Sequence, residues 1–444
     1  MPIYALTRIK QIILLVGDVA IFYGSLYLLL VIRYGYESFT YAELLPEHLA
    51  SFTTLLPFWI ALFYIGGLYD LGALKNNELF AKKIWGALLA ATVGSMLYFY
   101  FIPGEITPKT NLFWFMIMVA GTAYAWRYGY NGILGIKKAS ERLLVIGRGS
   151  ATNGLIEAIN QNPQLGYAVG ATQETLGDPQ ALQRVVAEKQ IRTVVVPSQL
   201  RNNKSAIMTI YHELARGTNM IDVATLYERV FNKIPLDEIE EVRFLEHVAE
   251  HRKLYASLVA PVEKLCACAL GIMLAPLLLG VVAMIKLTSQ GPTIYAQTRV
   301  GKYGKLFTIY KFRTMRIDAE KNGPQWAATD DDRLTTIGKL LRHTHLDELP
   351  QLWNIIRGEL SFVGPRPERP EFVATLKQQI PYYELRHLAN PGIAGWAQLH
   401  YRYGRSVDDA REKLQYDLFY LKHRSLLLDG AIFIRTIRLL IFNN

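Results

Sequence analysis

The sequence predicts a membrane protein of three parts: an N-terminal bundle of membrane-spanning α-helices, a middle α/β domain, and an α-rich C-terminal domain that begins with a further apolar stretch. Three observations support this prediction. Hydrophobic residues make up 51% of the 444 residues and charged residues only 19%, a balance typical of membrane proteins. The first third of the chain contains several apolar stretches that are long enough to cross a bilayer. Short strand-like runs alternate with helical ones in the middle.

Four apolar stretches predict four membrane spans within residues 1–138. Roughly 20 helical residues cross the hydrocarbon core, and the fourth stretch reaches that length only with its flanks. Basic residues gather in the loops on one side, whereas the other side holds only Arg33 and Lys109, so the N-terminus and everything after Arg142 are expected in the cytoplasm. No cleavable signal is expected, because the first stretch is long enough to span and more spans follow. The stretches are residues 12–32, 52–68, 84–102 and 112–125.

Three residues with reactive side chains lie inside apolar stretches. Asp18 is in the first span, within two turns of its end, and we expect it to pack against a neighbouring helix rather than to serve a function. Cys266 and Cys268 are the only cysteines, too few for a disulfide framework. We expect both to be small buried hydrophobic residues.

A fifth apolar stretch, residues 265–285, carries Pro276 near its centre. Proline removes a helical hydrogen bond and clashes with the preceding turn, so a sharp bend is expected there. The stretch could therefore cross the membrane as a kinked helix, or enter and return on the same side. Charge does not decide, because Lys264 and Lys286 lie at its two ends.

Between residues 142 and 241, short β-branched runs alternate with helical runs, a pattern that predicts βαβ units and a parallel sheet. A further helix is expected over residues 203–216. The first turn resembles the dinucleotide-binding fingerprint, with Gly147 and Gly149, but Thr152 stands where the third glycine belongs. The acid expected about 20 residues later is missing as well, since Glu174 comes too late and in a loop. Residues 139–245 are thus predicted to form a Rossmann-like domain with a structural or regulatory role rather than a working NAD site.

The chain is basic, with a net charge of +10, which favours acidic partners such as lipid head groups, phosphates or nucleic acid. From residue 287 onward, 23 Lys and Arg face 16 Asp and Glu, a net charge of 23 − 16 = +7. Many of these cations stand beside prolines and glycines. Fixed turns bearing Arg and Lys suit a multiply phosphorylated ligand, although a solvated or lipid-facing surface explains any single lysine as well.

Two carboxylates, Asp347 and Glu348, stand side by side in this basic region. Apolar spacing predicts a helix over residues 348–357, which puts Asp347 at the N-cap and Pro350 in the tolerant first turn. The positive end of the helix dipole then favours ionised carboxylates. An ionised Asp347 can act as a nucleophile, Glu348 can hold a divalent cation, and Arg342 can neutralise a phosphate. The alternative is a pair that only caps the helix.

The stretch KLLRHTHLDELPQLWNIIRGELSFVGPRP, with YKFRTM before it and PGIAGWAQ after it, resembles the bacterial sugar transferase family, the polyprenyl-phosphate hexose-1-phosphate transferases. The similarity runs from about Pro261 to the C-terminus. Four spans followed by a Rossmann-like domain also resemble the long-form members that initiate exopolysaccharide or O-antigen synthesis. The resemblance implies an α-rich, monotopic catalytic domain over residues 255–444, with a re-entrant membrane helix over residues 262–286 that is kinked at Pro276.

The resemblance also implies the chemistry. Asp347 would be the nucleophile, Glu348 its metal-associated partner with Mg²⁺ as cofactor, and both carboxylates would contact the metal. A UDP-sugar and undecaprenyl phosphate would be the substrates, at the cytoplasmic face of the bacterial inner membrane, with membrane lipid as a further partner and no nucleic acid. Separately from the resemblance, a regulatory middle domain is consistent with a homodimer. The groups expected to bind substrate phosphates are Arg299, Lys311, Arg313, Arg342 and Arg366.

Two positions depart from the family pattern. Ala275 precedes the kink proline where the family has serine, so a hydroxyl that could satisfy freed backbone groups is absent. His345 stands where the family has serine before Leu-Asp-Glu, and it is expected to be a surface imidazole rather than a proton carrier.

Two other functions fit parts of the pattern. A membrane-anchored NAD-dependent UDP-sugar dehydratase can also combine four spans with a Rossmann unit. It would need an intact glycine-rich turn and usually a Tyr-x-x-x-Lys pair, and no tyrosine in this chain has a lysine four residues later. A non-catalytic partner in polysaccharide assembly, which binds lipid-linked glycan, is the third possibility.

Overall fold

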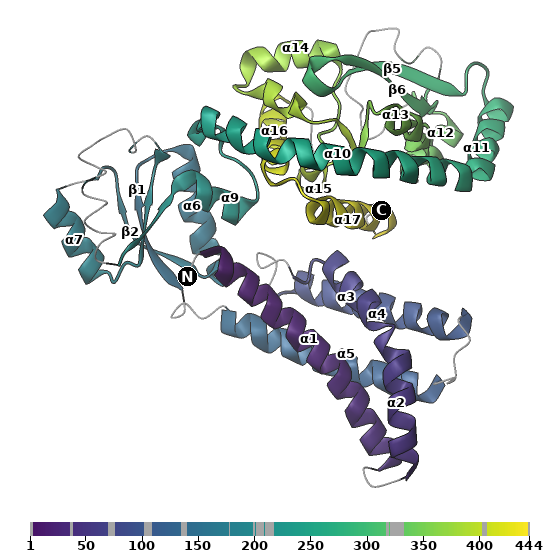
Figure 1. The fold of residues 1–444 in the computed structure, drawn as a ribbon, viewed down its shortest axis with the longest axis horizontal. Coiled ribbons are helices and arrows are strands. Elements are labelled where there is room, and N and C mark those ends of the chain that lie inside the picture. Colours follow the sequence, from purple (N-terminus) through teal and green to yellow (C-terminus); the bar gives the residue numbers. More distant parts are fainter. Residues whose placement is uncertain are drawn as a thin grey trace. The chain divides into compact units, whose positions relative to one another are not determined.

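The computed structural model divides the chain into two compact units, residues 1–221 and 222–444, which are described separately. Figure 1 shows the ribbon coloured along the sequence. The domain boundaries predicted from the sequence remain predictions. The structure describes residues 3–35, 39–69, 76–101, 109–134, 140–176, 178–198, 200, 208, 217–316, 319, 333–401 and 406–442.

The first unit begins with apolar helices. Three of its helical stretches are long and apolar enough to cross a membrane: Ile9–Tyr34, Leu44–Ile65 and Glu78–Phe101. The fourth predicted span lies in α5, which misses this criterion because Arg127 and small or aromatic residues dilute its second half. The five helices are α1 (Ile3–Tyr34), α2 (Phe39–Thr53), α3 (Leu56–Ile65), α4 (Glu78–Phe101) and α5 (Lys109–Leu134).

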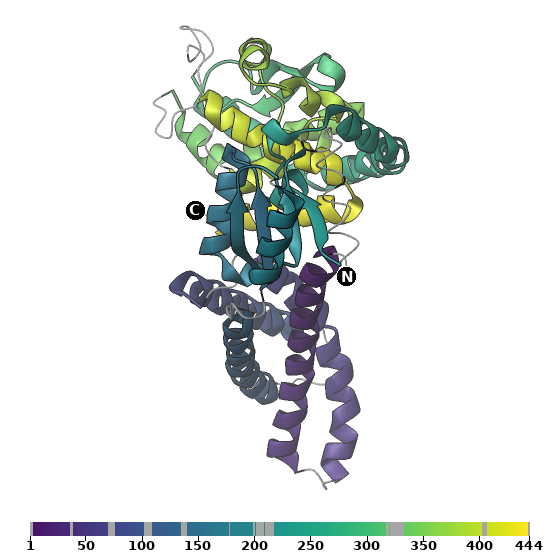
Figure 2. The same ribbon diagram turned by 90° about the vertical axis from the view of Figure 1, so that its left-hand side faces the viewer.

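These helices share one apolar core. Figure 2 shows α1 and α2 running antiparallel, and Phe22 of α1 packs edge-on against Phe115 of α5 at 5.1 Å between ring centres. Phe52 contacts the same ring at 4.9 Å. Aromatic pairs of this kind add specific geometry to the burial of apolar area. The outer faces keep large apolar side chains exposed, such as Tyr100 and Leu89, as expected of helices that meet lipid.

Asp18 is buried between helices, as the sequence predicted. The guanidinium of Arg127, on α5, is fully buried and donates through Nε to Asp18 Oδ1 at 3.2 Å and through a terminal nitrogen to Oδ2. The hydroxyl of Tyr69 donates to the same carboxylate at 2.7 Å. Another nitrogen of Arg127 donates to the carbonyl of Leu68. The acid therefore joins α1, α5 and the segment after α3 through a fully paired network.

The middle of the chain forms a four-stranded sheet in the order β2-β1-β3-β4. β1 pairs in parallel with β2 and β3, which confirms the predicted βαβ pattern. Gly147 turns the chain out of β1 with φ of +97°, a conformation that favours glycine. The helix predicted over residues 203–216 lies outside the described residues. The elements are β1 (Glu141–Ile146), α6 (Ser150–Gln161), β2 (Tyr167–Gln173), α7 (Pro179–Glu188), β3 (Thr193–Val196) and β4 (Asn219–Asp222), with a 3₁₀ turn η3 (Pro163–Leu165).

The second unit carries the predicted site on short elements packed around longer helices. Its first elements are α9 (Val223–Phe231), η5 (Leu236–Glu238), α10 (Glu241–Met273), α11 (Ala275–Thr288), β5 (Ile294–Val300), η6 (Lys302–Gly304), β6 (Leu306–Phe312) and α12 (Thr336–His343). They are followed by η7 (Leu346–Gln351), α13 (Leu352–Arg357), β7 (Ser361–Val363), α14 (Pro370–Gln379), η8 (Tyr383–Leu388), β8 (Gly392–Ala394), α15 (Trp396–His400), α16 (Val407–His423) and α17 (Leu426–Phe442).

α10 and α11 form one bent apolar segment. Their axes differ by 62° at Leu274, and Pro276 sits in the first turn of α11, so the bend predicted at this proline is confirmed. Together the two helices are long and apolar enough to enter a membrane. Cys266 and Cys268 are exposed, which corrects the expectation that they are buried. The reason is that α10 is apolar on its outer face too, with Ile272 78% exposed.

The core of the second unit includes the residues that follow the sheet. Glu228 of α9 accepts from Lys422 of α16 at 2.6 Å, and the backbone N–H of Ile234 donates to the carbonyl of Gln415 at 3.0 Å. Ile234 and Leu418 are buried in the same apolar cluster. These contacts fix α16 behind the site described next.

Candidate active site

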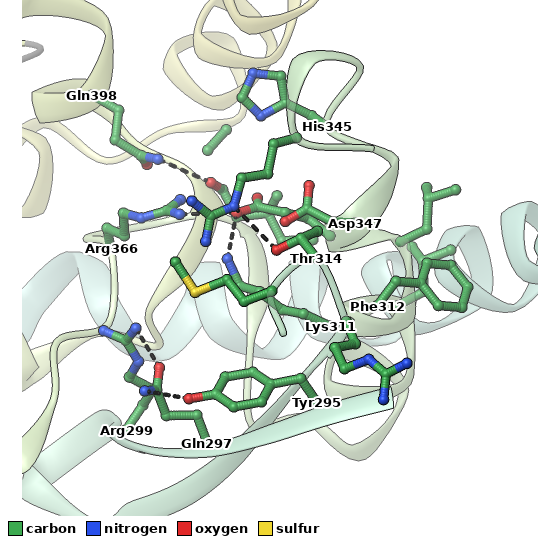
Figure 3. Close-up of a pocket in the computed structure, with 18 of the residues that line it drawn as sticks. Tyr295, Gln297, Arg299, Lys311, Phe312, Thr314, His345, Asp347, Arg366 and Gln398 are labelled. Atoms are coloured by element: carbon green, nitrogen blue, oxygen red, sulfur yellow. Dashed lines mark hydrogen bonds and ion pairs between the residues drawn. The ribbon is translucent and has the colours of Figure 1, made fainter. Parts of the chain in front are cut away.

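A cavity of about 1140 Å³ lies in the second unit. Its lining comes from β5, β6, α12, η7, the turn after β7, and parts of α10 and α17. Figure 3 shows Lys311 and Arg366 pointing toward one another from opposite sides, with Asp347 and Thr314 nearby. All seven predicted catalytic and phosphate-binding residues line it: Arg299, Lys311, Arg313, Arg342, Asp347, Glu348 and Arg366.

The two carboxylates lie on a 3₁₀ helix, which corrects the predicted α-helix over residues 348–357. His345 takes a left-handed conformation with φ of +54°, and from there η7 continues with bonds between residues three apart, such as Glu348 N–H to the His345 carbonyl at 3.2 Å. The α-helix begins only at Leu352. Asp347 is therefore not an α-helical N-cap, and the dipole of a long helix does not act on it. His345 itself is exposed at the cavity rim, as predicted for a surface imidazole.

Glu348 is held by two cations. Its Oε1 accepts from Lys311 Nζ at 2.7 Å and from Arg366 at 2.8 Å. Burial alone would raise the pKa of Glu348, but Arg366 and Lys311 outweigh burial and hold that pKa well below its usual range. Glu348 raises the pKa of Arg366 in return. Glu348 is thus ionised at neutral pH and sits in a charge-paired, rigid position.

Asp347 is the opposite case. The residue is only 7% exposed, yet in the part of the chain that the structure describes its carboxylate accepts no hydrogen bond. Burial, together with the neighbouring charge of Glu348, raises its pKa, while Lys311 and Arg342 oppose that rise. The expectation that position alone favours the ionised form is therefore wrong. A poorly solvated carboxylate facing a cavity is a reactive one once ionised.

Arg342 reaches the cavity from α12. Thr335 caps this helix by accepting the N–H of Gly338 at 2.9 Å. A Cβ at Gly338 would lie 1.9 Å from the carbonyl oxygen of Thr314, so only glycine lets α12 approach the end of β6 this closely. That approach brings Arg342 Nε to the hydroxyl of Thr314 at 3.1 Å.

Arg299 and Arg313 hold the walls of the cavity. Arg313 donates to Ser289, to its hydroxyl at 2.6 Å and its carbonyl at 3.2 Å, and so joins the end of β6 to the end of α11. Arg299 donates to Gln297 at 2.6 Å and to the carbonyl of Pro367 at 3.1 Å. The structure thus groups Lys311, Arg342 and Arg366 around the carboxylates. The other two arginines contact the surrounding elements.

Residues 256–443 match the bacterial sugar transferase family. The UDP-glucose:undecaprenyl-phosphate glucose-1-phosphate transferase of Escherichia coli is 30% identical over 338 residues, which cover 71% of this chain and 69% of that protein. This chain belongs to the bacterial sugar transferase family. The resemblance stated on the motif around Asp347 is confirmed.

Two further relatives in the family show how the similarity is distributed. The UDP-N-acetylgalactosamine-undecaprenyl-phosphate N-acetylgalactosaminephosphotransferase of Aeromonas hydrophila is 42% identical over 185 residues, which cover 42% of this chain and 44% of that protein. A UDP-glucose:undecaprenyl-phosphate glucose-1-phosphate transferase of Klebsiella pneumoniae is 26% identical over 401 residues, 80% of each chain. The chain thus spans less than half of the Aeromonas relative, and the names of these relatives specify different sugars.

Asn354 is a further residue of this family site, and it was not among the predicted site residues. Its side chain is fully buried, and its amide donates to the Thr308 carbonyl at 2.7 Å and to Glu359 at 2.8 Å, while its oxygen accepts the N–H of Tyr310 at 3.2 Å. It binds the free edge of β6, one residue from Lys311. The signal available in the sequence was a polar residue between apolar ones in LWNIIR.

Arg386 was missed as well. It is buried, donates to the carbonyl of Arg366 at 3.0 Å and pairs with Asp417 at 2.8 Å. This contact fixes the turn that carries Arg366. No sequence pattern distinguishes Arg386 from the other arginines of this basic region.

The donor set fits the predicted magnesium ion. Among the described residues, no group of three or more His, Cys, Asp or Glu side chains could enclose a metal. Mg²⁺ does not need such a group, because it commonly binds one or two carboxylates and takes its other ligands from substrate phosphates and water. Asp347 lines the cavity, and Oε2 of Glu348 is left over after both cations bind Oε1. These two carboxylates would hold it.

Proposed function

We propose that this chain transfers a sugar 1-phosphate from a UDP-sugar to undecaprenyl phosphate, through an intermediate in which the phosphosugar is bonded to Asp347. The observation that carries the proposal is a carboxylate without a hydrogen-bond donor beside one that two cations neutralise. The first is available to attack, and the second stays ionised without repelling an anionic substrate strongly. The relatives named above act on a UDP-sugar and undecaprenyl phosphate.

In the first half-reaction, an oxygen of Asp347 attacks the β-phosphorus of the UDP-sugar. The new bond joins Asp347 to that phosphorus, and the bond from the phosphorus to the bridging oxygen breaks, so UMP leaves with the electron pair. Arg342 and Arg366 lie on the lining and would balance the negative charge that grows on the leaving phosphate. When bound at Asp347 and Glu348, Mg²⁺ would supply further neutralisation of the diphosphate.

In the second half-reaction, a phosphate oxygen of undecaprenyl phosphate attacks the same phosphorus. The bond to Asp347 breaks and returns the carboxylate, and the product is a lipid-linked diphosphate sugar. A covalent route separates the two anionic substrates in time, so that the cations of one cavity serve each in turn. It also requires that Asp347 face both a water-soluble donor and a lipid acceptor.

The bent segment suits a membrane-bound enzyme of this kind. If α10 and α11 enter the bilayer and return at Leu274, the cavity stays on the cytoplasmic side of the inner membrane, the side that the loop charges of residues 1–138 also favour for the N-terminus. The Rossmann-like sheet would then be a cytoplasmic regulatory domain without a nicotinamide cofactor. The sugar is left open, because the relatives differ in the sugar they carry.

The test is exchange of labelled UMP into a panel of UDP-sugars by membranes that contain the full chain. Exchange needs no lipid acceptor if a covalent intermediate forms. Asp347→Asn should abolish exchange, whereas the matched variant Asp408→Asn, at an exposed position on α16, should retain it. Full turnover in Asp347→Asn would refute the assignment of the nucleophile, and mass spectrometry of trapped enzyme should find the phosphosugar on Asp347.

A further inference from the structure

The cavity does not end at the carboxylates. A mostly apolar part of its lining comes from three separate parts of the second unit: Leu270 of α10 with Leu274 at the bend, Ile393 of β8, and Phe433, Thr436 and Leu439 of α17. We propose that this apolar arm binds the isoprenoid units next to the phosphate of the lipid acceptor, with α17 as one wall. The inference rests on the proposed function and deepens it.

The side chains of α17 are arranged so that one side of the helix lines the cavity. Phe433, Thr436 and Leu439 are spaced by three residues and lie on one side of the helix. Ile432 belongs to the same stripe, four residues before Thr436 and seven before Leu439, and is fully buried in a cluster with Trp396 and Tyr420, which anchors this face of the helix on the unit. The hydroxyl of Thr436 donates to the Ile432 carbonyl at 2.8 Å, so this residue lines the cavity without an unmet hydrogen bond.

Phe433 marks where the arm is open. Its ring meets that of Phe362 edge-on at 6.4 Å between centres, yet Phe433 remains 44% exposed. A large aromatic side chain that lines a cavity while half uncovered is suited to pack against a hydrocarbon ligand. Phe362 belongs to β7, directly before the turn that carries Arg366. An aromatic surface and a phosphate-binding cation thus come from one short segment.

The opposite wall belongs to the bent segment. Leu270 and Leu274 immediately precede and occupy the bend, and the neighbouring Ile272 and Met273 are 78% and 66% exposed on the same helix. This is the segment that is long and apolar enough to enter a membrane. A chain lying in the bilayer beside the bend would therefore meet the arm without crossing water, which avoids the cost of exposing hydrocarbon.

The other side of the cavity is unsuited to hydrocarbon. Alternate residues of β5 point the same way, and Tyr295, Gln297 and Arg299 form a hydrogen-bonded row, at 3.0 Å from Gln297 to the Tyr295 hydroxyl and 2.6 Å from Arg299 to Gln297 (Figure 3). This polar row is where the nucleotide belongs. The two substrates would approach Asp347 from different sides.

The test fills the apolar arm without touching the polar side. In the full chain, in its native membranes, Thr436→Trp is compared with Leu427→Trp, an exposed position on the same helix that does not line the cavity. Three rates are measured: UMP exchange without lipid, transfer to undecaprenyl phosphate, and transfer to dimethylallyl phosphate, which has a single isoprene unit.

For Thr436→Trp we expect exchange within about twofold of wild type and a loss of at least about tenfold in kcat/KM for undecaprenyl phosphate, because the variant removes apolar contacts to the chain alone. Transfer to dimethylallyl phosphate should fall far less, and Leu427→Trp should match wild type in all three rates. Retained exchange also reports that the variant is folded.

Two outcomes would overturn the inference. Unchanged kinetics with undecaprenyl phosphate in Thr436→Trp would show that the chain does not lie along α17. An equal loss of exchange and of lipid transfer would show that the arm holds the nucleotide instead. Absence of exchange in the wild-type chain would overturn the proposed function itself, and this inference with it.

Discussion

Replacing Asn354 by alanine tests whether one buried amide aligns the two halves of the site. Asn354 lies on α13, directly after the 3₁₀ helix that carries Asp347 and Glu348, and it bonds the backbone of β6, which carries Lys311. Without it, the ion pair between Lys311 and Glu348 would join two elements that no longer have a fixed register.

The magnitude follows from what the variant leaves behind. Three hydrogen bonds are lost, at about 1 kcal/mol each, and backbone groups of the half-buried residues Thr308 and Tyr310 are left without that partner, at about 1 kcal/mol each, the low end of the cost for a buried group. Because the surrounding residues relax in part around the shortened side chain, we expect the free energy of unfolding to fall by about 3–5 kcal/mol. For a unit of this size, about 2–4 °C of melting temperature is lost per kcal/mol, so the midpoint should fall by on the order of 10 °C.

The measurement is protease resistance of the second unit after heating the full chain in detergent micelles, read as the temperature at which half of the fragment survives a short pulse. The matched control is Asn390→Ala, because the amide of Asn390 makes one exposed hydrogen bond, at 3.3 Å to the carbonyl of Gly358. That variant should shift the midpoint by no more than about 2 °C. Equal midpoints for the two variants would refute the role given to Asn354.

Two further predictions concern charge. Because burial raises the pKa of Asp347, the rate of UMP exchange should increase with pH, with a midpoint above the pKa of an ordinary aspartate, and then level off. Lys311 lowers the pKa of Asp347, so Lys311→Met should move this midpoint to higher pH. An unchanged midpoint in Lys311→Met would contradict the prediction. In the first unit, Asp18→Leu should lower the free energy of unfolding by about 3–5 kcal/mol, because Arg127 is left buried without its carboxylate partner. The double variant Asp18→Leu, Arg127→Leu should recover most of this stability, measured as the temperature of thermal aggregation.

Local patterns predicted the parts of the fold that depend on local rules. The bend at Pro276 could be predicted because the proline ring and the missing N–H disturb only the adjacent helical turn, which does not depend on distant residues. Gly147 turns the chain after β1 for a similar reason. The alternation of strands and helices in the middle of the chain likewise needs no distant partner to be recognised.

The site was predicted in its residues but not in its geometry. Apolar spacing alone gave an α-helix from residue 348, whereas the docking of Asn354 on β6 and the left-handed His345 produce a 3₁₀ helix that delays the α-helix to Leu352. The same distant packing buries Asp347 and reverses the expected direction of its pKa shift. Burial is a property of the whole unit, so sequence spacing does not report it.

The buried contact between Asp18 and Arg127 also constrains how the chain is made. The two residues are 109 positions apart, so the ribosome delivers the acid of α1 long before its partner on α5. During that interval α1 carries an uncompensated carboxylate, which the insertion machinery or the membrane surface must accommodate. The contact that ties α1 to α5 can therefore form only after α5, the last helix of this bundle, has been synthesised.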